Sequence, residues 1–188
     1  MACVDCIKTI LAVGASGALA LASSVLLGAA FPASAQVLQS GKHIPLGMAL
    51  EAAQAALQSC EASGYRVSVS VVDVAGVERT FLRGDHSTIH TRETAFKKAY
   101  TAATLGPIFG THTTSALTDK VSKTPTGPAL QTVSNVILLA GGVALRSGDE
   151  TLAAIGVGGA PGGALDEACA QAGVAQVQER LNSLTVRH

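Results

Sequence analysis

Three ionisable side chains near the middle of the chain have a spacing suited to metal binding. His86 and His90 are four residues apart, and Glu93 follows three residues later. Imidazole binds zinc, copper and iron, so the three side chains would hold a metal ion if they lay on one helical face. His86 is expected before the helix rather than in it, which spoils this geometry, and the alternative is a solvated polar face shared with Arg92 and Lys97. The spacing therefore indicates no more than weak iron binding at the surface.

Two further histidines could serve as an axial ligand of heme iron or as an acid–base group, because histidine titrates near neutral pH. His112 lies in a segment rich in Gly, Thr and Ser, and His43 directly precedes the first predicted helix. A single histidine in a loop also often faces solvent without a function. The residues alone leave both roles open for these two side chains.

A glycine cluster at residues 156–163 follows a predicted strand and opens a predicted helix, as a dinucleotide-binding loop does. The G-x-G-x-x-G spacing fails, because Pro161 occupies the position of the third glycine. Backbone N–H groups at the start of this helix could still hold an anion such as a carboxylate. The alternative is a flexible turn that packs closely against a neighbouring element.

Composition and motifs exclude several functional classes. The 188 residues include 13 Lys or Arg and 13 Asp or Glu, so the chain lacks the basic surplus of a nucleic-acid-binding protein. Hydrophobic residues make up 48%, which excludes a disordered chain. The sequence contains no G-x-S-x-G, H-E-x-x-H or P-loop motif, and its scattered carboxylates form no readable catalytic pair. These observations favour a binding protein over an enzyme without deciding the question.

The first 35 residues have the pattern of a secretory signal peptide. Lys8 precedes an apolar run over residues 9–31, and the small-x-small sequence Ala33-Ser34-Ala35 follows it. We expect cleavage after Ala35, which leaves residues 36–188 as one exported domain, periplasmic or secreted, with no membrane span. The run is also long enough to remain as an uncleaved anchor.

Cys60 and Cys169 remain in the exported domain, each in a predicted helix. In an oxidising compartment they could form a disulfide if the first and last helices pack side by side. Two separate buried thiols are the alternative.

Hydrophobic periodicity predicts helices and short strands along the domain. Helices are predicted over residues 46–63, 88–105 and 164–181, and strands over 65–73, 77–83, 136–140, 143–146 and 151–157. Residues 106–135 contain little predicted structure besides a short helical piece near 115–121, and such a long segment is usually functional or mobile. Tight turns join most of the strands, which excludes parallel pairing. The sequence therefore predicts an α+β fold with a five-stranded antiparallel sheet flanked by helices.

Several short motifs follow one another in a distinctive order over residues 46–181. They are Val71-Val72-Asp73-x-x-Gly76, Arg83-x-Asp85, Lys98-Ala99-Tyr100-Thr101-Ala102, Thr114-Ser115-Ala116-Leu117, Gly141-Gly142, Ala154-Ile155-Gly156-Val157-x-Gly159 and Asp166-Glu167-x-Cys169-x-x-Ala172-Gly173. In order and spacing they resemble the GlcG/HbpS family of heme-binding proteins, whose domain also forms the C-terminal part of PduO-type proteins. The resemblance implies a five-stranded antiparallel sheet, symmetric homo-oligomers, and binding of heme or of surface iron.

The resemblance also suggests residues for a heme site. It places the ligand pocket at the segment that begins with Thr114, so the neighbouring His112 is our first choice of axial ligand and His43 our second. Heme propionates would then meet Arg83, Lys98 or backbone N–H groups near Gly159.

Arg83 and Lys98 also have a purely structural interpretation. They could tie the second strand to the second helix as salt bridges through Asp85 or Asp73.

Three functions follow from these observations. The first is an exported heme-binding protein for sequestration, transfer or redox sensing. The second is an enzyme or accessory subunit for a small carboxylate or aromatic metabolite, in which Arg83 and Lys98 bind the acid and His112 or Asp85 moves a proton. The third is an oligomer whose surface recognises a partner protein.

Overall fold

The computed structural model describes residues 42–184. The predicted signal peptide and its cleavage site lie outside these residues. The described elements are α1 (Leu46–Ala62), β1 (Ser68–Asp73), β2 (Glu78–Arg83), α2 (Thr91–Phe109), α3 (Thr114–Val121), α4 (Thr126–Leu130), β3 (Gly142–Ser147), β4 (Glu150–Gly158) and α5 (Gly163–Asn182). Within the described range, no helix combines the length and the apolar character needed to cross a bilayer.

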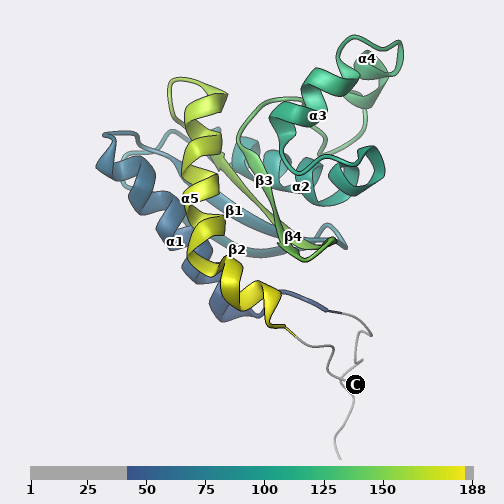
Figure 1. Ribbon diagram of the computed structural model, residues 1–188. Coiled ribbons are helices and arrows are strands. Elements are labelled where there is room, and N and C mark those ends of the chain that lie inside the picture. The colour runs from purple at the N-terminus through teal and green to yellow at the C-terminus, as the bar shows by residue number, and fades with distance from the viewer. Residues whose placement is uncertain (1–41, 185–188) are drawn as a thin grey trace, which may run out of the picture. The chain divides into compact units, whose positions relative to one another are not determined.

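The strands form one sheet in the order β2-β1-β4-β3, and every neighbouring pair is antiparallel. Helices α1 and α5 pack side by side on one face of this sheet, and α2 covers the opposite face (Figure 1). Alternation along the strands separates the two faces. Val69 and Val71 belong to the core beneath α1 and α5, whereas Gly156 and Gly158 of β4 lie against the backbone and side chains of α2. The expected antiparallel α+β architecture is therefore confirmed.

The sheet has four strands rather than the expected five, because residues 136–140 are not a strand. The backbone N–H of Ile137 donates to Thr101 Oγ1 of α2 at 2.9 Å instead of to a neighbouring strand. Leu138 packs with Leu117 and Val121 of α3 in a small separate cluster. The segment is thus apolar because it lies between α2 and α3, and not because it belongs to the sheet.

The middle of the chain is more helical than expected. Helix α2 continues past Gly106 and Pro107 and ends at Gly110, which has a left-handed φ of 63°. The N–H of Thr111 then donates to the Gly106 carbonyl at 2.9 Å and closes the helix end. Helices α3 and α4 follow and extend beyond the sheet at the upper right of Figure 1.

A disulfide between Cys60 and Cys169 joins α1 to α5, with the two Cα atoms 5.5 Å apart. The sequence left this pairing open, conditional on side-by-side packing of the first and last helices. Gly173 of α5 permits that packing, since a Cβ there would collide with the Ala52 carbonyl of α1. The disulfide therefore lies in the core layer that backs the sheet.

Candidate functional site

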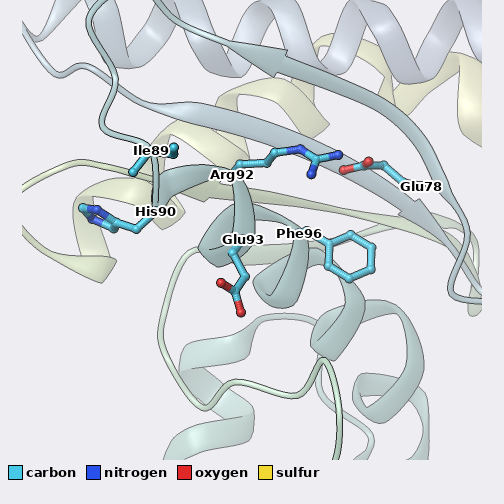
Figure 2. Close-up of a pocket in the computed structure, with 6 residues that line it drawn as sticks. All are labelled: Glu78, Ile89, His90, Arg92, Glu93 and Phe96. Carbon is cyan, nitrogen blue, oxygen red and sulfur yellow. The ribbon is translucent and has the colours of Figure 1, made fainter.

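A surface hollow of about 810 Å³ lies where the first two turns of α2 meet β2 (Figure 2). We call it the outer hollow. It is lined by Glu78, Ile89, His90, Arg92, Glu93 and Phe96. Ile89 is 85% exposed, so an apolar side chain faces solvent beside an imidazole and a guanidinium. Apolar surface with a few polar groups is the usual character of a small-molecule site.

Helical spacing brings the α2 residues of the outer hollow to one side. Glu93 and Phe96 are three residues apart, and Arg92 and Phe96 are four apart, which places these side chains on one helical face, while Ile89 lies in the turn that precedes α2. The Arg92 guanidinium lies 5.5 Å from the centre of the Phe81 ring on β2, and Figure 2 shows it extending toward Glu78. The ring of Phe96 lies 5.9 Å from that of Tyr100. Of these three aromatic residues, Phe96 lines the hollow, and Phe81 and Tyr100 each lie next to one of its lining residues.

The carboxylates of the outer hollow have different partners. Glu78 Oε1 accepts a hydrogen bond from Ser70 Oγ of β1 at 2.8 Å, which holds its carboxylate above the sheet. Glu93 pairs with Lys97 at 2.6 Å, and the hydrogen bond from Lys97 lowers the pKa of the Glu93 carboxyl. The side chains of Glu93 and Lys97 are both exposed enough for solvent to screen their charges, so this ion pair contributes little to stability.

A second hollow of about 380 Å³ lies on the other side of the same helix. We call it the inner hollow. It is lined by His90, Thr94, Lys98, Leu139, Ala140, Gly159, Ala160, Gly163, Ala164 and Asp166. Positions 90, 94 and 98 are four residues apart and form one stripe of α2, while the remaining residues come from the segment before β3, the glycine loop and the start of α5. His90, which immediately precedes α2, is shared by both hollows.

The inner hollow contains a buried ion pair. Lys98 Nζ donates to Asp166 Oδ2 at 2.6 Å and to the Val157 carbonyl at 2.9 Å, and both charged side chains are at most 5% exposed. Asp166 Oδ1 also accepts from the Ala160 N–H at 2.9 Å. Burial raises the pKa of the Asp166 carboxyl, while the Lys98 ammonium and the loop N–H groups act against that rise.

The residue after Asp166 holds the neighbouring segment in place. Glu167 accepts hydrogen bonds from Ser115 Oγ at 2.5 Å, from the Ser115 N–H at 3.2 Å and from the Gly141 N–H at 3.2 Å. Thr114 Oγ1 accepts from the Gly142 N–H at 2.9 Å. The two ends of the α3–α4 segment are therefore joined at the start of α5, next to the ion pair.

The structure brings some of the residues predicted for a ligand site together. Lys98 and Gly159 line the inner hollow, Glu93 lines the outer one, and His90 lines both. The exposed side chains of His43, His86, Arg83 and His112 line neither hollow, and neither does the buried Thr114.

The proposed metal set is not assembled among the described residues. His86 lies outside α2 with a left-handed φ of 63°, so it does not share the helical face of His90 and Glu93. Over residues 42–184, no group of three or more His, Cys, Asp or Glu side chains is arranged to hold a metal ion.

Arg83 and Lys98 both have structural contacts, but not with Asp85 or Asp73, the partners expected from the sequence. Arg83 donates to the Ser87 carbonyl at 2.8 Å and to Ser87 Oγ at 3.3 Å, and so holds the turn between β2 and α2. Lys98 pairs with Asp166, 68 residues away in the sequence, and neither Asp85 nor Asp73 takes part.

Sequence reasoning missed Thr94, Phe96 and Asp166 as parts of a site. The spacing of positions 90, 94 and 98 was available as a signal, because residues four apart share a helical face. The contribution of Asp166 had no such signal, since only the folded chain brings the start of α5 to Lys98, 68 residues away in the sequence.

The described residues form a small α+β domain with two hollows at its surface. The sequence matches the family described as haem degrading protein HbpS-like over residues 44–175, and the chain belongs to this HbpS-like family. No curated protein matches the sequence.

Solved structures agree with this assignment. A crystal structure of HbpS is 37% identical, covers 74% of this chain and 93% of its own, and superimposes with a TM-score of 0.65. A double mutant of Streptomyces reticuli HbpS is 36% identical, with coverages of 78% and 97% and a TM-score of 0.65. A PduOC:heme complex is 25% identical, with coverages of 72% and 95% and a TM-score of 0.62. The family description and the PduOC:heme complex both name heme.

Proposed function

We propose that this chain is an exported heme-binding protein that uses the outer hollow as its heme site. The observation that carries the proposal is the exposed His90 imidazole beside the apolar side chains of Ile89 and Phe96, with the Arg92 guanidinium nearby. Heme needs an apolar surface for its ring, and its propionates need donors. His90 would supply the nitrogen ligand to iron, and Arg92 would pair with a propionate.

The location outside the cytoplasm rests on two observations. Residues 1–35 have the pattern of a signal peptide. The Cys60–Cys169 disulfide requires an oxidising compartment to form and persist. Sequestration, transfer and redox sensing of heme are all compatible with such a protein, and assembly into a homo-oligomer is part of the proposal by analogy with the family.

A hemin titration that follows the Soret band tests this proposal. We expect a saturable shift at stoichiometric hemin that is lost in His90→Ala and retained in His112→Ala and His43→Ala. Loss only in His112→Ala or His43→Ala would keep heme binding and return the ligand to the residue first chosen from the sequence. An unsaturable rise in the wild-type chain would reject heme as the ligand.

A further inference from the structure

The inner hollow offers hydrogen-bond donors that the fold itself does not use. An ammonium group has three N–H donors. Two of those on Lys98 bind Val157 and Asp166, and the third has no partner among residues 42–184. This charged side chain is 5% exposed and lines a hollow large enough for a small molecule.

Two glycines pack closely against the residues around this ammonium group. A Cβ at Gly141 would lie 2.8 Å from Lys98 Nζ, and one at Gly163 would lie 2.7 Å from the Ala140 carbonyl at the wall of the hollow. Any side chain at either position would therefore displace the lining. Glycine at both positions therefore lets the backbone approach the buried charge and keeps the lining in place.

The remaining lining suits a carboxylate with an apolar stem. Leu139 and Ala140 form an apolar wall, and Leu139 is 52% exposed at the opening. Gly163 and Ala164 begin the 20-residue helix α5, whose N-cap residue Gly162 provides no side-chain cap. Helix N-termini favour anions, so this end adds to the attraction of Lys98.

The charge balance limits which anion fits. Both oxygens of Asp166 are engaged, one by Lys98 and one by the Ala160 N–H. The ammonium charge is therefore already shared with one carboxylate, and a doubly charged phosphate would be repelled by Asp166 more strongly than a singly charged group. The hollow accordingly favours a monocarboxylate.

We propose that the inner hollow is a carboxylate-binding pocket, with Lys98 as the donor and Leu139 and Ala140 in contact with the attached carbon chain. The carboxylate has two possible sources. It is a heme propionate if the ligand extends past His90 from the outer hollow, and this first possibility rests on the proposed function. It is a free small acid otherwise.

The test compares hemin with hemin dimethyl ester, which keeps the ring and iron but lacks free carboxylates. Loss of one charge-assisted hydrogen bond corresponds to about tenfold in affinity, so we expect hemin to bind the wild-type chain about tenfold more tightly than the ester. The ester also lacks the propionate that would pair with Arg92, so the variants described below are needed to assign the difference to the inner hollow. Benzoate and inorganic phosphate are titrated separately, with the backbone amide signals of Gly163 and Ala164 followed by NMR.

A variant that fills the hollow is preferable to one at Lys98, because removing Lys98 would leave Asp166 buried without a partner. Ala164 lines the hollow and is exposed in the first turn of α5, so Ala164→Phe should fold while blocking the pocket. Ala168, exposed one turn further along the same helix and not part of the lining, provides the matched control Ala168→Phe. We expect Ala164→Phe to abolish the preference for hemin over the ester, or the benzoate shifts, and Ala168→Phe to preserve them.

The outcomes separate the two proposals. Equal binding of hemin and its ester, without benzoate shifts, would overturn both the carboxylate pocket and the pairing of Arg92 with a propionate, and would leave heme binding itself intact. Benzoate shifts that disappear in Ala164→Phe, without saturable hemin binding, would support the pocket for free acids and reject the heme function. Phosphate binding as tight as that of benzoate would overturn the assignment to a monocarboxylate, and no response to any ligand would overturn both proposals.

Discussion

Asp166 is the residue whose replacement should affect stability most directly through charge. Its carboxylate is the anionic partner of the buried Lys98 ammonium, at 2.6 Å. Breaking a buried pair by removing one charge typically costs about 3–5 kcal/mol, because the other charge stays buried and uncompensated. We expect Asp166→Asn to lower the free energy of unfolding by about that amount in urea denaturation. Glu93→Gln breaks the exposed pair with Lys97 and should cost less than about 1 kcal/mol. Equal losses in the two variants would contradict a buried, unscreened pair.

Gly159 is required by its backbone conformation as well as by space. Its φ of 133° is one that L-residues rarely adopt, and a Cβ would lie 2.5 Å from the Arg66 carbonyl. Such strain costs of the order of 1–3 kcal/mol, so thermal unfolding of Gly159→Ala should show a lowered Tm. Gly162 in the same loop has an extended φ of −166° and open space around it, so Gly162→Ala should leave the Tm nearly unchanged. A Tm for Gly159→Ala that matches this control would show that the loop relaxes without cost.

At the scale of the elements, patterns confined to one segment could be read from the sequence. The three long helices and the strands around Val71, Leu82 and Ile155 follow from local periodicity, and each is present near its predicted bounds. Residues 136–140 could not be assigned in this way. A run of five apolar residues occurs both in buried strands and in extended segments that pack beneath a helix, so the sequence pattern does not distinguish them. Only the bond from Ile137 to Thr101 distinguishes the two.

The candidate site was less predictable than the fold for the same reason. Lys98 and Gly159 were selected from the sequence and lie in the inner hollow, but Asp166 completes it from a distant helix. The sequence placed His90 in a possible metal set and His112 first for a heme ligand, but of these two exposed histidines only His90 lines the outer and inner hollows.

The contact between α1 and α5 includes an ion pair that should respond to acid. Glu51 of α1 pairs with Arg180 of α5 at 2.6 Å, and the hydrogen bond from Arg180 lowers the pKa of the Glu51 carboxyl below its ordinary value of 4.5. The folded state therefore binds fewer protons here than the unfolded state, so this stabilisation is present above pH 4.5 and is lost as the pH falls through the lowered pKa. Glu51→Gln should flatten the decline in stability below pH 4.5, measured by urea denaturation at a series of pH values. Arg180→Gln should flatten it equally, and slopes identical to the wild type would show that the pair does not persist in solution.

For the molecule as a whole, the disulfide is the covalent restraint that limits the unfolded chain. Cys60 and Cys169 are 109 residues apart, so the bridge closes a loop that contains the entire sheet. In the chain-entropy model a loop of about 100 residues contributes about 4.7 kcal/mol at 25 °C, mainly by restricting the unfolded state. We expect the double variant Cys60→Ala, Cys169→Ala to lose about 4–5 kcal/mol of unfolding free energy, an estimate from the same model.

Reduction provides an independent measurement of the stability that the disulfide contributes. A strong reductant should lower the Tm of the wild-type chain toward that of the double variant and leave the variant itself unchanged. Both sulfur-bearing residues are buried, with Cys60 fully buried and Cys169 4% exposed, so reduction should require transient opening of the contact between α1 and α5 and should proceed more slowly than for an exposed disulfide. A wild-type Tm that does not respond even after reduction in denaturant and refolding would show that the two helices hold together by packing alone. In that case the stability of this domain would not depend on the disulfide.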